Sequence, residues 1–468
     1  MKKDWKELIY AYALKNAIEH EGKALVSSVL SSLFHEGLEK KDVKNIIKEI
    51  EKIANEINNK NLEQQKSEFK NYEKLISHRK EREGLPELKD AEKGVVVRFS
   101  PAPSGPLHIG NVSTAVLNSL YAKKYNGKFY VRIEDTNPSN IYPKAYDMIK
   151  EECDWLFDNV TAYIIQSERM KKYYDLAEEL IKKSVAYVCT CKSEEHKKLV
   201  EKSMACNCRN LSAEEHMKRW KKMLSKGKNN YKEGEAVLRF KSDLKNPNPA
   251  LRDFPLARIN LNQHPKQKKK YRVWPLMNLS VTADDIDMKI THAIRGKDHM
   301  DNAKRQEMMY KVLGKKPPIT IFTGKYKFKD LELSKTKTRK LIEEGKYSGW
   351  DDIRLPFINS LRKRGYLPES FAKMAENRGI SEVDKVLTKE EYFEILDNYN
   401  RALLREKTRK VEYDFSKRKG FKEYYLLMPD NTKKEIFVKD KVKDNEIVFF
   451  SNLGYAKLNK NVFWFAHK

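Results

Sequence analysis

The stretch Val95-Val-Val-Arg-Phe-Ser-Pro-Ala-Pro-Ser-Gly-Pro-Leu-His-Ile-Gly-Asn111 decides the fold that we predict for this chain. The β-branched run at 95–97 is typical of a buried parallel strand, and the prolines at 101, 103 and 106 force the chain to turn after it. From Asn111 the apolar residues recur at helical spacing, and a second strand is predicted at 128–133. The pattern therefore predicts a strand–loop–helix–strand unit.

The tetrapeptide His108–Asn111 lies where this helix is expected to begin. A helix N-terminus offers unpaired N–H groups and the positive end of a dipole, which suit a phosphate. Gly110 leaves room for a flat base, and His108 can donate to a phosphate oxygen and stabilise charge in a transition state. A turn with a surface histidine is the plain alternative, which the proline-rich lead-in and the βαβ context disfavour.

The stretch resembles the ATP-binding signature of class I aminoacyl-tRNA synthetases, in the form typical of archaeal and eukaryotic glutamyl-tRNA synthetases. The resemblance implies a multidomain α/β protein whose catalytic domain is of the Rossmann type. It also implies ATP with Mg²⁺ bridging its phosphates, L-glutamate and tRNA(Glu) as substrates, and a glutamate–tRNA ligase reaction. The ATP-binding residues that it implies are Ser100, Pro101, Ala102, Pro103, Ser104, Gly105, Pro106, Leu107, His108, Ile109, Gly110, Asn111 and Lys335.

Composition agrees with a polyanionic partner without requiring one. The 468 residues include 94 Lys and Arg against 67 Asp and Glu, a formal net charge of +27. Such an excess favours phosphate contacts, although a generally lysine-rich protein would give the same total. The sequence contains no apolar run long enough for a membrane span, and its N-terminus is charged, so we expect a cytoplasmic protein without a membrane partner and a monomer.

Six regions are predicted along the chain. Residues 1–90 form a helical extension with three apolar stripes, ending in a linker near 84–86; it is either a docking appendage or a solvated extension. The catalytic domain occupies 91–185 and 271–340. The family resemblance makes 186–270 an acceptor-arm insertion, and its part at 209–270 is expected to be basic and irregular and to lie along RNA. A helical stem-contact subdomain covers 341–400, and a reduced β-rich anticodon-side domain covers 401–468, with strands at 424–428, 435–438, 446–450 and 462–465.

The insertion carries a cysteine cluster. Cys189, Cys191, Cys206 and Cys208 form two close pairs, the ligand set of a closed structural zinc site, and four protein ligands leave no open position for catalysis. Free reduced cysteines are the alternative. Cys153 falls in a helical run and is expected in the core.

The family resemblance also assigns an amino-acid site. Arg98, Glu134, Met277, Asp284 and Arg295 are its predicted residues, with the two arginines suited to the carboxylates of glutamate and Glu134 to an ammonium. The predicted catalytic residues are His108 and a loop lysine, Lys335 or Lys337, in the segment Leu331-Glu-Leu-Ser-Lys-Thr-Lys-Thr-Arg-Lys340.

Several positions depart from the family pattern. Ala102 and Met277 replace polar residues of the pocket, and Glu332 replaces the first lysine of the loop. A methionine cannot donate a hydrogen bond, so specificity for glutamate is in question. The alternatives left open are a glutaminyl-tRNA synthetase-like enzyme, a catalytically altered tRNA-binding paralogue, and a ligase that also charges tRNA(Gln), since the anticodon side is short.

Overall fold

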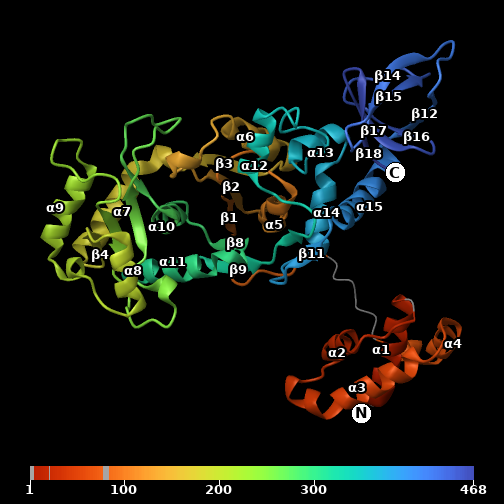
Figure 1. Ribbon diagram of the computed structural model, residues 1–468, viewed down its shortest axis with the longest axis horizontal. Coiled ribbons are helices and arrows are strands. Elements are labelled where there is room, and N and C mark those ends of the chain that lie inside the picture. Colours follow the sequence, from red (N-terminus) through yellow and green to blue (C-terminus); the bar gives the residue numbers. More distant parts are fainter. Residues whose placement is uncertain (1–4, 21, 77–83) are drawn as a thin grey trace. The chain divides into compact units, whose positions relative to one another are not determined.

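The computed structural model describes residues 5–20, 22–76 and 84–468. The chain forms two compact units that divide between Glu83 and Gly84 (Figure 1). In the part of the chain that is described, no helix is both long and apolar enough to cross a membrane.

The first unit is a small helical body. Its helices are α1 (Trp5–Glu19), α2 (Val26–His35), α3 (Val43–Asn58) and α4 (Leu62–Tyr72). The first three follow the predicted apolar stripes, which bury their side chains against one another in a core that includes Ile9, Val29 and Ile53. The fourth helix, α4, begins within a strongly charged segment. Asn61 caps it, and its side-chain oxygen accepts the N–H of Gln64 over 2.9 Å.

The second unit is built on parallel strands. β1 (Val96–Phe99), β2 (Lys128–Ile133) and β3 (Val160–Ile165) pair in that order, and β8 (His292–Gly296) pairs with β9 (Ile319–Thr323). β8 starts beside β1, where the N–H of Thr291 donates to the carbonyl of Val96 over 3.0 Å. The parallel sheet that the quoted stretch predicts is therefore present, and its carboxyl ends are where such sheets bind ligands.

Helices pack against these strands and position the site. α5 (Ile109–Lys124) connects β1 to β2, and α6 (Ala145–Leu156) connects β2 to β3. The others are α7 (Met170–Lys182), α10 (Met277–Asp287) and α11 (Met300–Val312). The core between strands and helices includes Val97, Ile109 and Phe129, all fully buried, and Cys153 is buried as predicted.

The expectation that 209–270 is irregular is wrong. This region contributes α9 (Ala213–Leu224), β5 (Val237–Phe240) and β6 (Pro255–Ile259), and it forms an antiparallel sheet with β4 (Ala186–Cys189) and β7 (Val273–Pro275). α8 (Ser193–Glu201) lies between the cysteine pairs. The charged residues of α9 conceal a narrow apolar stripe through Trp220 and Met223, which are both fully buried. The helix is therefore an ordinary amphipathic helix that its charged sequence obscures.

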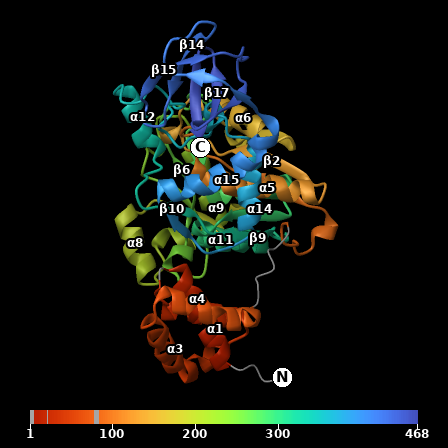
Figure 2. The same cartoon turned by 90° about the vertical axis from the view of Figure 1, so that its right-hand side faces the viewer.

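The C-terminal third is helical and then β-rich. α12 (Lys335–Glu343), α13 (Ile358–Arg364), α14 (Pro368–Arg378) and α15 (Lys389–Lys407) follow one another, and β10 (Tyr326–Phe328) pairs with β11 (Lys385–Leu387). The chain then forms one seven-stranded sheet at one end of this unit (Figure 2). Its strands are β12 (Arg409–Val411), β13 (Tyr413–Asp414), β14 (Lys422–Leu427), β15 (Lys433–Val438), β16 (Ile447–Phe450), β17 (Gly454–Asn459) and β18 (Val462–His467).

Candidate functional site

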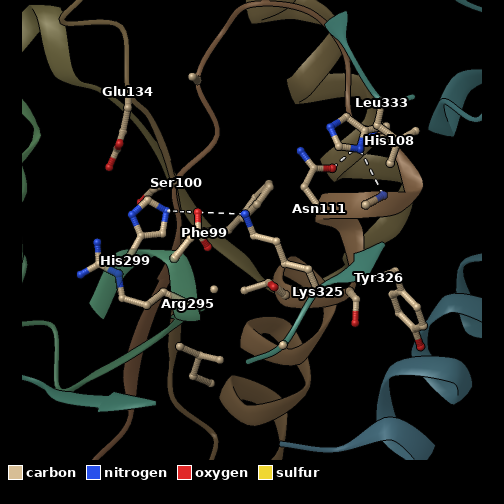
Figure 3. A pocket seen from close by; sticks show the side chains of 18 of the residues that line it. Phe99, Ser100, His108, Asn111, Glu134, Arg295, His299, Lys325, Tyr326 and Leu333 are labelled. Carbon is tan, nitrogen blue, oxygen red and sulfur yellow. Dashed lines mark hydrogen bonds and ion pairs between the residues drawn. The ribbon is translucent and has the colours of Figure 1, made fainter. Parts of the chain in front are cut away.

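A cavity of about 480 Å³ opens at the carboxyl ends of β1, β2 and β8, beside the N-terminus of α5 (Figure 3). The predicted site residues that line it are Arg98, Ser100, Ala102, His108, Gly110, Asn111, Glu134, Met277 and Arg295. The predicted residues that lie outside its lining are Pro101, Pro103, Ser104, Gly105, Pro106, Leu107, Ile109, Asp284, Lys335 and Lys337.

His108 caps helix α5. Its Nδ1 accepts the N–H of Gly110 over 3.1 Å, and Asn111 Oδ1 accepts the N–H of His108 over 3.0 Å. Burial, aided by the charge of Lys335, lowers the pKa of His108 to about 3. The imidazole is therefore neutral, and because Nδ1 accepts a hydrogen bond, Nε2 carries the proton and can donate it.

Arg295 is a buried cation without an anionic partner in the described chain. Its Nη1 donates to the amide oxygen of Gln306 over 2.9 Å, and its Nε has no hydrogen-bond partner. Burial and the nearby Arg98 lower the pKa of Arg295 to about 10. A guanidinium in this setting gains most from an incoming carboxylate, which can satisfy its free donors and its charge together.

Glu134 follows strand β2 and faces the same cavity. Burial raises the pKa of its carboxyl, while Arg132, whose Nη2 lies 3.3 Å away, opposes that rise. Its backbone N–H donates to the carbonyl of Pro101 over 3.0 Å, which ties the end of β2 to the loop after β1. The cavity thus places the carboxylate of Glu134 beside the two arginines, Arg98 and Arg295.

Asp284 is turned into the protein. Its carboxylate accepts hydrogen bonds from Gln166, Arg169 and Tyr173 at 2.8, 2.7 and 2.9 Å, and its side chain is fully buried. These partners satisfy its oxygens, so it holds α10 to the start of α7.

The adjacent Asp285 and the buried Arg132 are the residues that brace the cavity, and the sequence reasoning missed both. Asp285 Oδ1 lies 3.4 Å from Arg98 Nε and 2.5 Å from Arg132 Nη1. Successive residues of a helix point about 100° apart, so Asp285 faces Arg98 while Asp284 faces Gln166, Arg169 and Tyr173. The sequence shows the pair, and only the packing of α10 decides which member lies beside Arg98.

The two loop lysines have different surroundings. Lys335 begins α12, and its ammonium donates to the carbonyl of Gly105 over 3.0 Å. Burial lowers the pKa of Lys335 to about 8, while Glu152 opposes the fall. Lys337 is largely exposed and pairs with Glu332 over 2.8 Å. The loop also places Leu333 against Gly110, so closely that a Cβ at Gly110 would lie 2.6 Å from Leu333 Cδ1.

Asp298, His299 and Lys325 are further lining residues that the sequence reasoning did not assign. Lys325 Nζ lies 2.9 Å from Asp298 Oδ2, and His299 Nε2 lies 3.7 Å from it (Figure 3). Two of the three directly follow Arg295-Gly-Lys, so the continuation of that motif was the available signal.

The cysteine cluster is assembled in space. The Sγ atoms of Cys189, Cys191, Cys206 and Cys208 all lie within 4.8 Å of one another. Two of the separations are 3.9 Å, close to the sulfur spacing around a tetrahedral ion with Zn–S bonds of about 2.3 Å. This donor set fits a structural zinc ion.

Comparisons with known proteins agree on a family. A family model described as tRNA synthetases class I (E and Q), catalytic domain, matches residues 94–400. The chain is 40% identical over 407 residues to a glutamate–tRNA ligase of Methanothermobacter thermautotrophicus, covering 86% of this chain and 72% of that protein. It is 42% identical over 393 residues to a glutamate–tRNA ligase of Thermococcus kodakarensis, covering 82% of this chain and 68% of that protein.

A similar solved structure is a glutamate tRNA ligase from Elizabethkingia meningosepticum in complex with its amino acid. Its TM-score is 0.46 at 20% identity, and the match covers 67% of this chain and 70% of that chain.

Proposed function

This chain belongs to the class I tRNA synthetases for glutamate and glutamine, as its signatures predict, and we propose that it is a glutamate–tRNA ligase. Support comes from relatives of that name at 40% and 42% identity and from the cavity beside α5. The structural observation that carries the amino-acid assignment is Arg295, a buried guanidinium whose hydrogen-bond partner is an amide rather than a carboxylate.

In the proposed mechanism, the cavity first orients the two small substrates. Arg98 and Arg295 bind the carboxylates of glutamate, and Glu134 binds its ammonium group. The N-terminus of α5 and the Nε2–H of His108 bind the phosphates of ATP. Hydrogen-bond donors at this position stabilise the negative charge that develops on the phosphate oxygens in the transition state. The Mg²⁺ that accompanies ATP would be held by the phosphate oxygens and would neutralise part of their charge.

Activation then joins the two substrates. An oxygen of the glutamate α-carboxylate attacks the α-phosphorus of ATP, the bond from that phosphorus to the bridging oxygen breaks, and pyrophosphate leaves with the electron pair. In the second step a ribose hydroxyl at the tRNA 3′ end attacks the activated carbonyl carbon, loses its proton, and releases AMP. We assign Lys335 rather than Lys337 to the leaving pyrophosphate, because Lys335 contacts the loop that precedes His108 and Lys337 pairs with Glu332 at the surface.

The direct test is ATP–pyrophosphate exchange with glutamate or glutamine in the presence of purified tRNA. We expect exchange with glutamate and little with glutamine. Exchange with glutamine alone would make the protein a glutaminyl-type enzyme, and exchange with neither would support a tRNA-binding paralogue.

The choice of tRNA is a finer part of the proposal. We expect the enzyme to charge tRNA(Glu) with glutamate. Because the 401–468 region is short, tRNA(Gln) is a second substrate to test. Aminoacylation of the two separated tRNA species measures this directly. Rejection of tRNA(Gln) would restrict the enzyme to tRNA(Glu).

The remaining assignments concern the parts around the catalytic domain. We propose that 186–270 contacts the acceptor arm with a structural Zn²⁺ on its four cysteines, that 341–400 contacts the tRNA stem, and that 401–468 lies on the anticodon side. We also propose that residues 1–90 form a helical extension and that the protein is a cytoplasmic monomer. Support for the zinc ion comes from the sulfur spacing.

A further inference from the structure

The sulfur of Cys208 is contacted by hydrogen-bond donors from two separate parts of the insertion. Thr190, in the loop after β4, reaches this sulfur with its backbone N–H and with its hydroxyl, each over 3.4 Å. Arg219, on α9, donates to it through Nη1 over 3.5 Å. A thiolate has no proton of its own to donate, so a deprotonated Cys208 accepts all three contacts.

Arg219 is held in place for this contact by its own helix. Its Nε donates to Oε1 of Glu215, one turn earlier on α9, over 3.0 Å, and its side chain is 21% exposed. A guanidinium carries five N–H donors in a rigid fork, so it can bond a carboxylate and a sulfur at the same time. Arg209, which directly follows Cys208, donates through Nε to Asp253 over 2.8 Å instead.

The charge of the cluster gives such a cation a use. Four thiolates carry more negative charge than one Zn²⁺ ion can offset, so the loaded centre remains an anion. Cys189, Cys206 and Cys208 are buried, and Cys191 is partly buried. A buried anion is costly unless it is paired and hydrogen-bonded, and a guanidinium N–H that points at the sulfur supplies both.

The helix that carries Arg219 also belongs to the core of the insertion. Trp220, the next residue, and Met223 are fully buried in a core that includes Leu238 of β5. The cysteines form a smaller cluster of their own with Tyr187 of β4. The contact between Arg219 and Cys208 therefore connects the cysteine cluster to the main core of the insertion.

We propose that Arg219 is a positioning residue for the metal site: its guanidinium, oriented by Glu215, holds the Cys208 sulfur in place and stabilises the excess negative charge of the zinc-loaded cluster, together with the donors of Thr190. This inference rests on the proposed structural Zn²⁺. It makes α9, and not the cysteines alone, a determinant of how tightly the metal is bound. Partners that hydrogen-bond metal ligands typically contribute about 10- to 100-fold to metal affinity.

Competition for zinc between the full-length protein and a chelator of known affinity tests this. We expect Arg219→Ala to lower the zinc affinity by about 10- to 100-fold. Lys218→Ala, at the exposed neighbouring position of α9, should keep the wild-type affinity. Thr190→Val should lower the affinity by a smaller factor, because it removes a neutral hydroxyl donor and leaves the backbone N–H.

Cobalt(II) in place of zinc supplies a measurement that a merely structural role for Arg219 would not change. The sulfur-to-cobalt charge-transfer absorption depends on the electron density at the sulfurs, which hydrogen bonds tune. We expect this band to move to lower energy in Arg219→Ala, because the guanidinium no longer stabilises the electrons of the Cys208 sulfur. Lys218→Ala should leave the band where it is in the wild type.

A wild-type zinc affinity in folded Arg219→Ala would overturn the inference. A lowered affinity with an unchanged cobalt band would also overturn it, since the arginine would then only hold α9 in place. If Arg219→Ala does not fold, Thr190→Val decides by the same two measurements, and wild-type values for both overturn the inference.

The two proposals fail in different ways. A wild-type protein that binds well under one zinc ion per chain would contradict the proposed metal site and this inference with it, whereas a zinc-loaded protein that is indifferent to Arg219→Ala would contradict this inference alone. The measurements need neither ATP, glutamate nor tRNA. A protein with the expected zinc and cobalt results but no exchange activity would therefore contradict the ligase assignment alone.

Discussion

At the scale of single residues, Arg295 differs from the other arginines of the cavity. Arg98 and Arg132 share Asp285, whereas Arg295 bonds the neutral Gln306. We expect Arg295→Lys to raise the KM for glutamate by about 10- to 100-fold, since hydrogen bonds to charged groups contribute about 1.5–3 kcal/mol. The KM for ATP should stay near the wild-type value. Pyrophosphate exchange at varied glutamate measures both.

The chain offers a matched control for that change. Arg305 lies on α11 and donates through Nε to the carbonyl of Ala250 over 2.8 Å, away from the cavity lining. Arg305→Lys should leave the KM for glutamate unchanged. An unchanged KM in Arg295→Lys itself would remove this residue from the amino-acid site.

His108 leads to a prediction about acid pH. Its pKa is lowered to about 3, so the imidazole stays neutral as the pH falls through the ordinary histidine value, and it gains a proton only near the lowered one. We therefore expect no loss of exchange activity from His108 near its ordinary value of about 6.5. A rate profile for the wild type and for His108→Asn, which keeps a good helix cap, would show this. An acid limb near that value that disappears in the variant would contradict it.

At the scale of elements, the cysteine cluster leads to a prediction about the loss of a bound metal. Four sulfurs within 4.8 Å of one another repel as thiolates unless a cation joins them. We expect Cys206→Ser to reduce bound zinc well below one ion per chain and to lower the melting temperature. Elemental analysis and calorimetry measure the two effects. Cys153→Ser, a buried cysteine outside the cluster, should keep the metal, and an equal loss there would contradict the assignment.

Elements also show what the sequence could and could not predict. β2 spans the predicted residues, and α5 begins at Ile109, inside the tetrapeptide 108–111 where the helix is predicted to begin. Both could be predicted because their signals are local: prolines, a helix cap and apolar spacing. α9 was missed because its charged residues outnumber the few residues it buries. Which of Asp284 and Asp285 lies beside Arg98 depends on the rotation of α10. The different surroundings of Lys335 and Lys337 depend on a loop more than 200 residues away in sequence. Such pairings are tertiary, so no short window contains them.

At the scale of the whole molecule, the two compact units have separate cores. The first unit packs Ile9, Val29 and Ile53 among its own helices, and the residues that line the cavity beside α5 run from Arg98 to Leu333. The groups that we assign to glutamate and ATP therefore all belong to the second unit. Groups that share no partners usually contribute independently.

This independence predicts the result of a truncation. A chain that begins at Gly84 should keep glutamate-dependent pyrophosphate exchange, with KM values for ATP and glutamate within about twofold of the full chain, because no assigned ligand group is removed. Exchange kinetics on both proteins, with circular dichroism to verify that the shorter one is folded, make the comparison. The full chain with Arg295→Lys supplies the control, since it should fail for glutamate while remaining folded. A folded truncation that has lost exchange would show that the first unit takes part in activation itself.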